Sequence, residues 1–273
     1  IFCQLVHAGG QTTSKVIGKA PLAPSSVDFP SYTETPQALD EDEIAELVNA
    51  FAAAARRAQE AGFDGVQLHG AHGYLINQFL SPLTNQRDDG YGGTPQKRMR
   101  FLEEVLVAVR HAVGRDFPVA IKLTASDQLP DGFDIEDAVA VSWRLQELGI
   151  DAIEVSSGTP ASGALGPVRQ KIDAPQDEAS NAPLARRIKD ALEIPVMVVG
   201  GLRSGEVMQR LLQEGDADLL ALSRPLIREP DLPRKLQQEP GYTATCISCN
   251  GCFKPGLRGQ GVSCVIGPAT GER

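Results

Sequence analysis

The fold is decided by a pattern that the chain uses three times, first in the stretch Ala61-Gly62-Phe63-Asp64-Gly65-Val66. The pattern returns as Leu-Gly-Ile-Asp-Ala-Ile at residues 148–153 and as Glu-Gly-Asp-Ala-Asp-Leu at residues 214–219. In each copy a helix ends at a glycine, which takes the left-handed conformation that closes helices, and an aspartate leads into a buried strand. Such short returns from helix to strand are typical of α/β proteins with a parallel sheet.

The same alternation continues on both sides of these stretches and predicts six strand–helix units. Short runs rich in Val, Ile, Leu and Ala predict strands at 1–6, 64–69, 118–123, 151–156, 195–200 and 218–222. Apolar residues at helical spacing predict helices at 41–61, 95–113, 134–148, 182–192, 204–214 and 231–238. Asp40 with Glu43 predicts a capping box on the first helix, and Thr94 before Pro95 predicts the start of the second.

The loops of this pattern are unequal in length. Helix-to-strand turns take a few residues, whereas the strand-to-helix loops 7–40, 70–94 and 157–181 are long. Long loops are uncommon unless they have a function. In a barrel and in a doubly wound sheet alike, these loops gather at the carboxyl ends of the strands, where active sites lie. The loops therefore locate a site without choosing between the two folds. The prolines of loop 7–40 predict an ordered covering segment.

Composition excludes several classes of protein. The 273 residues carry a net charge of −9, so no basic excess exists for nucleic acid or an anionic membrane. We see no apolar run of transmembrane length and no signal peptide, and we expect a cytoplasmic protein. Five cysteines do not suggest a secreted disulfide framework. The chain opens at Ile1, without Met and inside a predicted strand, so we expect a truncated protein.

The strongest candidates for catalysis follow the second strand. His69 and His72 come at its end, and the phenol of Tyr74 is two residues further on. Two imidazole N–H groups could hold a developing oxyanion while the tyrosine supplies a proton. A metal site and purely structural histidines are the alternatives. Lys122 lies inside an apolar strand, where it needs an anion or an electron-rich cofactor unless its amine reaches the strand end.

Two later strands end in residues that suit a phosphate. Gly200 and Gly201 end one strand, and Ser223 and Arg224 follow the next. Exposed backbone N–H groups and a guanidinium bind phosphate, and the last two strands of barrels often carry such a site. Two tight turns are the alternative.

A cysteine-rich tail ends the chain. Cys246, Cys249, Cys252 and Cys264 could bind zinc or an iron–sulfur cluster, although the last gap does not match a ferredoxin. Cys3 stands apart and is expected to be a packed thiol.

Four segments carry a family resemblance: Gln4–Gly10, Ala61–Leu75, Gln78–Pro82 and Asn85–Gly93. Together they resemble the Old Yellow Enzyme family of NAD(P)H:flavin oxidoreductases, over residues 1–240. The resemblance implies an α/β fold, a (β/α)8 TIM barrel truncated at its N-terminus to six βα units, with FMN at the carboxyl ends of the strands. It divides the chain into an FMN-binding barrel domain, 1–240, and a cysteine-containing tail, 241–273.

The resemblance also implies roles for the candidate residues. Gln4 would bond the pyrimidine edge of FMN, Lys122 would lie near flavin N1 and O2, and the phosphate would be held by Gly200, Gly201, Ser223 and Arg224. His69 and His72 would bind a carbonyl or nitro oxygen, and Tyr74 would protonate the α-carbon. The implied reaction passes hydride from NAD(P)H through FMN to the β-carbon of an activated alkene, a small-molecule substrate. The protein could form a homo-oligomer.

Two other hypotheses stay open. The family has two βα units before the residue that begins this chain, so the chain could be an incomplete fragment that binds FMN poorly or not at all. The tail resembles the cluster-binding cysteines of enoate and dienoyl-CoA reductases. Only two residues separate Cys249 from Cys252, where that branch has three. This departure favours free thiols over an iron–sulfur component.

Overall fold

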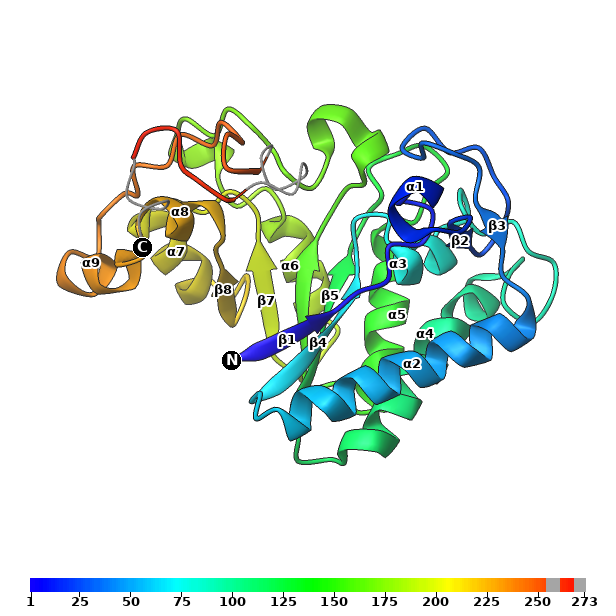
Figure 1. Ribbon diagram of the computed structural model, residues 1–273. Coiled ribbons are helices and arrows are strands. Elements are labelled where there is room, and N and C mark those ends of the chain that lie inside the picture. Colours follow the sequence, from blue (N-terminus) through cyan, green and yellow to red (C-terminus); the bar gives the residue numbers. More distant parts are fainter. Residues whose placement is uncertain (254–260, 268–273) are drawn as a thin grey trace. The chain divides into compact units, whose positions relative to one another are not determined.

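In the computed structural model, which describes residues 1–253 and 261–267, strands and helices alternate as the sequence predicts (Figure 1). The main strands are β1 Phe2–Leu5, β4 Gly65–Gly70, β5 Val119–Thr124, β6 Ala152–Ser156, β7 Val196–Val199 and β8 Leu219–Ala221. The helices that alternate with them are α2 Glu41–Glu60, α4 Pro95–Val113, α5 Ile135–Glu147, α6 Ala182–Lys189, α7 Gly205–Gln213 and α9 Leu232–Gln238. All the predicted strands and helices are thus confirmed, with small differences at their ends.

The predicted helix boundaries rest on local chemistry that the structure contains. The Asp40 carboxylate accepts the Glu43 N–H at 2.8 Å, and Glu43 accepts the Asp40 N–H at 3.0 Å, so α2 has a complete capping box. Thr94 Oγ1 accepts the Lys97 N–H at 3.3 Å at the start of α4. After α2, Gly62 has a φ of +83°, the left-handed conformation that its place in the repeated pattern requires.

The chain divides into two compact units. Residues 1–167 with 187–196 form the first, and residues 168–186 with the described residues from 197 onward form the second. In the first unit β1, β4, β5 and β6 pair in parallel, with each strand beside the next along the series. In the second unit β7 pairs in parallel with β8.

The register of the first unit places polar side chains on one face. Gln4 lies opposite Gln67, His69 lies opposite Lys122, and Lys122 lies opposite Glu154. Because alternate residues of a strand share a face, all five side chains leave the same side of the sheet. The helices α2 and α4 pack closely on each other beside these strands (Figure 1).

Several short elements lie inside the long loops and were not predicted. They are α1 Ser14–Ile17, β2 Leu22–Ala23 paired with β3 Gln37–Ala38, α3 Leu75–Leu80, and the 3₁₀ turns Pro160–Leu165 and Pro175–Asp177. A further short helix that was not predicted, α8 Arg224–Arg228, follows β8. The loops are therefore structured segments, as the prolines of loop 7–40 suggested.

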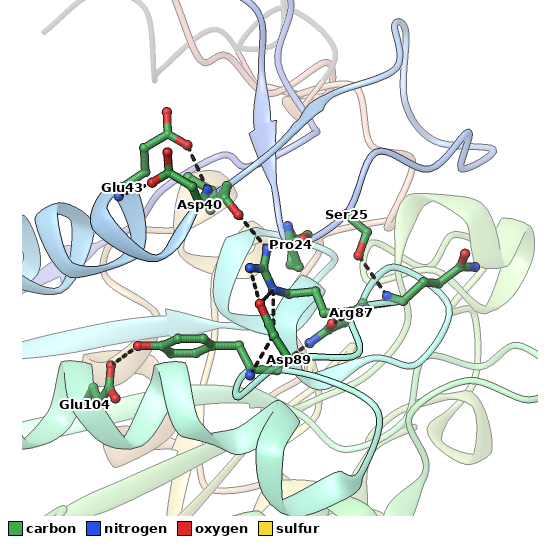
Figure 2. A network of polar contacts seen from close by, with 11 residues as sticks. Pro24, Ser25, Asp40, Glu43, Arg87, Asp89 and Glu104 are labelled. Carbon is green, nitrogen blue, oxygen red and sulfur yellow. Dashed lines mark hydrogen bonds and ion pairs between the residues drawn. The ribbon is translucent and has the colours of Figure 1, made fainter.

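Arg87 fastens loop 7–40 to the loop that follows α3 (Figure 2). Its guanidinium donates to the carbonyl oxygens of Pro24 at 2.8 Å and Leu39 at 2.5 Å. Arg87 Nε donates to both Asp89 carboxylate oxygens, at 3.1 and 3.0 Å. Only 11% of the Arg87 side chain is exposed, so this clamp is largely shielded from water. The clamp explains part of the Asn85–Gly93 motif as a structural device.

In the second unit, Glu229 anchors the segment that leads to the cysteines. Its carboxylate accepts hydrogen bonds from Lys235 Nζ and Tyr242 OH, both at 2.6 Å, and from Thr245 N and Oγ1 at 2.6 and 2.7 Å. Burial alone would raise the pKa of Glu229, but these hydrogen bonds outweigh it and lower the pKa to about 2. Thr245, the residue before Cys246, is therefore held in place by Glu229.

Among the described helices, none has the length and apolar character needed to cross a membrane.

Candidate active site

The structure brings together the three residues predicted to act on a substrate. His69 is near the end of β4, and His72 and Tyr74 follow in the turn before α3. The His69 ring lies edge-on to both others, with centroid distances of 5.3 Å to His72 and 4.8 Å to Tyr74. Two imidazoles and a phenol thus form one cluster at the carboxyl end of a buried strand.

Both imidazoles are neutral at pH 7. Burial and then the positive charge of Lys122 lower the pKa of His69 to about 4. Burial, and then His69 and Lys122, lower the pKa of His72 to about 3. The Ala71 backbone N–H donates to His69 Nδ1 at 3.3 Å, so the ring proton of neutral His69 resides on Nε2. His69 therefore offers one N–H donor without carrying a charge.

The backbone of His72 is held in an uncommon conformation. Its φ of +62° lies in the left-handed region, which costs free energy for a residue other than glycine. Thr124 Oγ1 accepts the His72 N–H at 2.9 Å, and Gln11 Nε2 donates to the His72 carbonyl at 2.7 Å. On the ring, His72 Nε2 lies 2.7 Å from Ser156 Oγ. These contacts from three other segments fix the imidazole in place.

Helix α3 ties the histidine turn to the loop after β1. Gln78 Oε1 accepts the Gly10 N–H at 3.1 Å, while Gln78 Nε2 donates to the Gly73 carbonyl at 2.6 Å. Asn77 Oδ1 accepts the Gly73 N–H at 2.6 Å. Asn77 in turn is held by the buried Asp127, whose Oδ1 accepts from Asn77 Nδ2 at 3.3 Å. The Gln78–Pro82 motif therefore positions the site.

A row of hydrogen bonds crosses the polar face of the first unit. Gln4 Nε2 donates to Gln67 Oε1 at 2.6 Å, and Gln67 Nε2 donates to Glu154 Oε2 at 2.8 Å. Glu154 Oε1 pairs with Lys122 Nζ at 3.1 Å. The row connects Gln4 and Lys122, the two residues predicted at the pyrimidine edge of a flavin, and supplies the partner that Lys122 needs.

Sequence reasoning missed the connecting residues of this site. Gln67, Glu154 and Ser156 lie within predicted strands, and Thr124 lies one residue past the predicted strand 118–123, at the end of β5. Their partners come from other segments. Glu154 alone carried a signal, because a carboxylate inside the apolar strand Ala152–Ser156 needs a partner just as Lys122 does.

In the second unit, all four predicted phosphate residues follow the paired strands β7 and β8. Val199, the last residue of β7, lies opposite Ala221, the last residue of β8. Gly200 and Gly201 therefore leave one strand next to the turn in which Ser223 and Arg224 leave the other. Gly201 has a φ of +73°, and a Cβ there would lie 2.4 Å from Ile172 Cδ1. The positive φ and this close packing favour glycine at the turn.

Arg224 lies against the cysteine segment. Its Nη1 donates to the Arg169 carbonyl and to Asn250 Oδ1, both at 2.7 Å. Arg224 Nη1 therefore already has protein partners. A phosphate would have to bind the N–H groups on the other two nitrogens of the guanidinium.

The four tail cysteines border one small cavity. Cys246, Cys249, Cys252 and Cys264 line a space of about 10 Å³ together with Arg224. Burial raises the pKa of Cys252. In residues 1–253 and 261–267 no three His, Cys, Asp or Glu side chains are grouped to hold a metal ion.

Comparison with known proteins agrees with this fold. The model of the NADH:flavin oxidoreductase / NADH oxidase family matches residues 1–241. A metal reductase from Desulforamulus reducens is 38% identical over 274 residues, which is 100% of this chain and 40% of the relative. An NADPH dehydrogenase from Geobacillus sp. (strain WCH70) is 41% identical over 260 residues, 94% of this chain and 71% of the relative. The chain thus spans about two fifths of the length of the first relative.

Among solved structures, an old yellow enzyme homologue from Zymomonas mobilis is 31% identical, with a TM-score of 0.74. The similarity covers 91% of this chain and 70% of that one. The fold is an α/β fold of the TIM-barrel class, as the sequence predicted. The chain belongs to the NADH:flavin oxidoreductase / NADH oxidase family, which confirms the family resemblance.

Proposed function

We propose that the chain forms the FMN site and the catalytic face of an NAD(P)H-dependent oxidoreductase that reduces activated alkenes. The observation that carries this proposal is the cluster of neutral His69 and His72 with Tyr74 at the end of β4. Neutral imidazoles suit a substrate oxygen that gains negative charge during reaction, since they donate hydrogen bonds where that charge develops.

The polar row fits the pyrimidine edge of a flavin. Gln4 Oε1 accepts no hydrogen bond from the described residues, and Lys122 Nζ lies further along the same face. One acceptor and one cation match the N3–H group and the N1/O2 edge of isoalloxazine. In this proposal the turns of Gly200, Gly201 and Ser223, with Arg224, hold the phosphate. When bound, FMN supplies the hydride chemistry, with NAD(P)H as the reductant.

Each catalytic side chain has one task in this proposal. His69 Nε2–H donates to the carbonyl or nitro oxygen of the substrate, and His72 donates to the same oxygen. These two bonds withdraw electrons from the alkene and make its β-carbon electrophilic. The Tyr74 hydroxyl then gives its proton to the α-carbon, as a general acid. The low pKa values of both histidines ensure that neither acts as the acid at neutral pH.

The proposal is tested by the visible absorbance of the purified protein under anaerobic conditions. Flavin bands should be present, should bleach when NADPH or NADH is added, and should return when 2-cyclohexenone follows. A protein that stays colourless after incubation with FMN would instead support the fragment hypothesis.

The cysteine segment supports a second candidate function, electron transfer through an iron–sulfur cluster. The specific observation is that four cysteines border one cavity. We derive no reaction step from it, because the described thiols are not grouped to hold a metal ion. Iron and acid-labile sulfide in anaerobically purified protein would establish the cluster, and their absence together with four titratable tail thiols would dismiss it.

A further inference from the structure

We infer that Glu154, acting through Gln67, is a positioning residue that turns the amide oxygen of Gln4 toward the flavin and holds Lys122 beside it. The inference rests on the proposed function, because it concerns how this chain recognises the pyrimidine edge of FMN. It assigns a task to Glu154, which no sequence motif marked, and to Gln67, which lies in the Ala61–Leu75 segment but had no role assigned.

The direction of the row is set by Glu154. Its side chain is only 8% exposed, and Oε1 pairs with Lys122 Nζ at 3.1 Å. An ionised carboxylate accepts hydrogen bonds and donates none. Gln67 must therefore point its NH₂ group at Glu154 Oε2, and it does so at 2.8 Å.

The orientation of the Gln67 amide then fixes the orientation of the Gln4 amide. Because the NH₂ group of Gln67 donates to Glu154, only its carbonyl oxygen can face Gln4. Gln4 therefore donates from Nε2 to Gln67 Oε1, at 2.6 Å. A side-chain amide can turn by 180° with almost no change in shape, so its hydrogen-bond partners decide its orientation. The Gln4 carbonyl oxygen is left to accept, at the end of a row whose other end is a fixed cation.

This arrangement has a chemical consequence for the ligand. The pyrimidine edge of isoalloxazine carries one donor, N3–H, between two carbonyl oxygens. A Gln4 oxygen can accept the N3–H bond, whereas a reversed amide would set donor against donor. Glu154 therefore determines whether the site distinguishes a flavin with N3–H from one without it.

The matched pair of variants is Glu154→Gln and Glu103→Gln. A glutamine at 154 keeps the shape but can donate as well as accept, so Gln67 and Gln4 can both reverse. Glu103 makes a comparable ion pair with Arg144, Oε1 to Nε at 3.0 Å, between helices α4 and α5 and away from the polar row. The same chemical change there controls for loss of an ion pair.

The experiment measures dissociation constants for FMN and 3-methyl-FMN by quenching of flavin fluorescence, using full-length protein freed of flavin. We expect wild type and Glu103→Gln to bind 3-methyl-FMN about tenfold more weakly than FMN, the loss expected for an orphaned acceptor. In Glu154→Gln the FMN constant should rise and the ratio should fall toward one.

A Glu154→Gln variant that keeps the wild-type ratio would overturn the inference and leave the proposed function standing. A wild type that binds no FMN would overturn the proposed function and the inference with it. A measurement on protein without flavin tests the inference independently of the proposed function. By ¹⁵N NMR the side-chain NH₂ group of Gln4 should exchange with solvent more slowly in wild type, where it donates to Gln67 Oε1, than in Glu154→Gln, where the reversed amide has lost that partner. Equal exchange in both proteins would also overturn the inference, and an otherwise unchanged spectrum would show that the variant is folded.

Discussion

Thr124 on β5 holds the backbone of His72 through a 2.9 Å hydrogen bond from the His72 N–H to the Thr124 hydroxyl. The contact joins a residue of a rigid strand to the one catalytic candidate with a positive φ. A strained backbone conformation persists where surrounding contacts hold it in place, and here Thr124 on the neighbouring strand provides such a contact.

Replacing Thr124 with valine should destabilise the turn that carries His72. Valine keeps the shape but leaves the His72 N–H without its acceptor, which costs about 1–3 kcal/mol for a buried donor. We expect that loss in the free energy of unfolding, measured with urea. Thr124→Ser retains the hydroxyl and should recover most of the stability. Equal losses in both variants would contradict the role given to the hydroxyl.

Replacing Lys122 with methionine should raise the pKa of both His69 and His72. The Lys122 charge lowers the pKa of each imidazole, and its removal leaves burial as the main remaining cause. Histidine ring signals followed by NMR against pH would report this directly, since the chain has 4 histidines. Lys97→Met, at an exposed position in α4, should change neither value. Unchanged or lower values in Lys122→Met would contradict the account.

The free energy of unfolding should fall as the pH is lowered from 7 to 5. His69 and His72 have folded pKa values of about 4 and about 3, below the value of 6.5 expected for the unfolded chain. The unfolded chain therefore binds more protons in this window. Linkage then predicts a loss of about 2 kcal/mol per histidine between pH 7 and pH 5.

The control for this pH effect is the double variant His69→Asn with His72→Asn. Asparagine tolerates the left-handed backbone at position 72 and does not titrate. Urea denaturation at several pH values should show a flatter dependence in this variant. The same slope as in wild type would mean that other groups cause the loss.

Replacing Arg87 with lysine should loosen loop 7–40. Lysine cannot reproduce the forked bonds to Asp89 together with those to Pro24 and Leu39. We expect a loss of about 1–3 kcal/mol, the cost of leaving buried hydrogen-bonding groups unpaired, and faster proteolysis within residues 24–39. Arg56→Lys, in an exposed pair with Glu60, should change stability by less than about 1 kcal/mol. Cleavage at the wild-type rate in Arg87→Lys would contradict the clamp.

The regular elements could be predicted from sequence because their signals are local. Apolar spacing predicted α2 and α4, and the capping chemistry of Asp40 and Thr94 marked their first residues. The repeated Gly–Asp pattern marked the turn after α2 at Gly62. These signals act within a few residues and need no knowledge of tertiary contacts.

The site could be predicted only at the residues that stand out in one strand or turn. His69, His72, Tyr74 and Lys122 stand out because their chemistry is unusual after or within an apolar strand. The residues that position them, such as Thr124 and Glu154, lie 52 positions from His72 and 87 from Gln67 along the chain. Their tasks depend on strand register, which no single segment encodes.

The central claim is that His69, His72 and Tyr74 activate an alkene for hydride delivery to its β-carbon. The most direct test is turnover of 2-cyclohexenone with NADPH that carries deuterium at the transferred position, under anaerobic conditions, followed by NMR of the product. The account predicts deuterium at the β-carbon and a solvent-derived proton at the α-carbon, with a much slower reaction in Tyr74→Phe. Reduced product without deuterium at the β-carbon, or an unchanged rate in Tyr74→Phe, would contradict it.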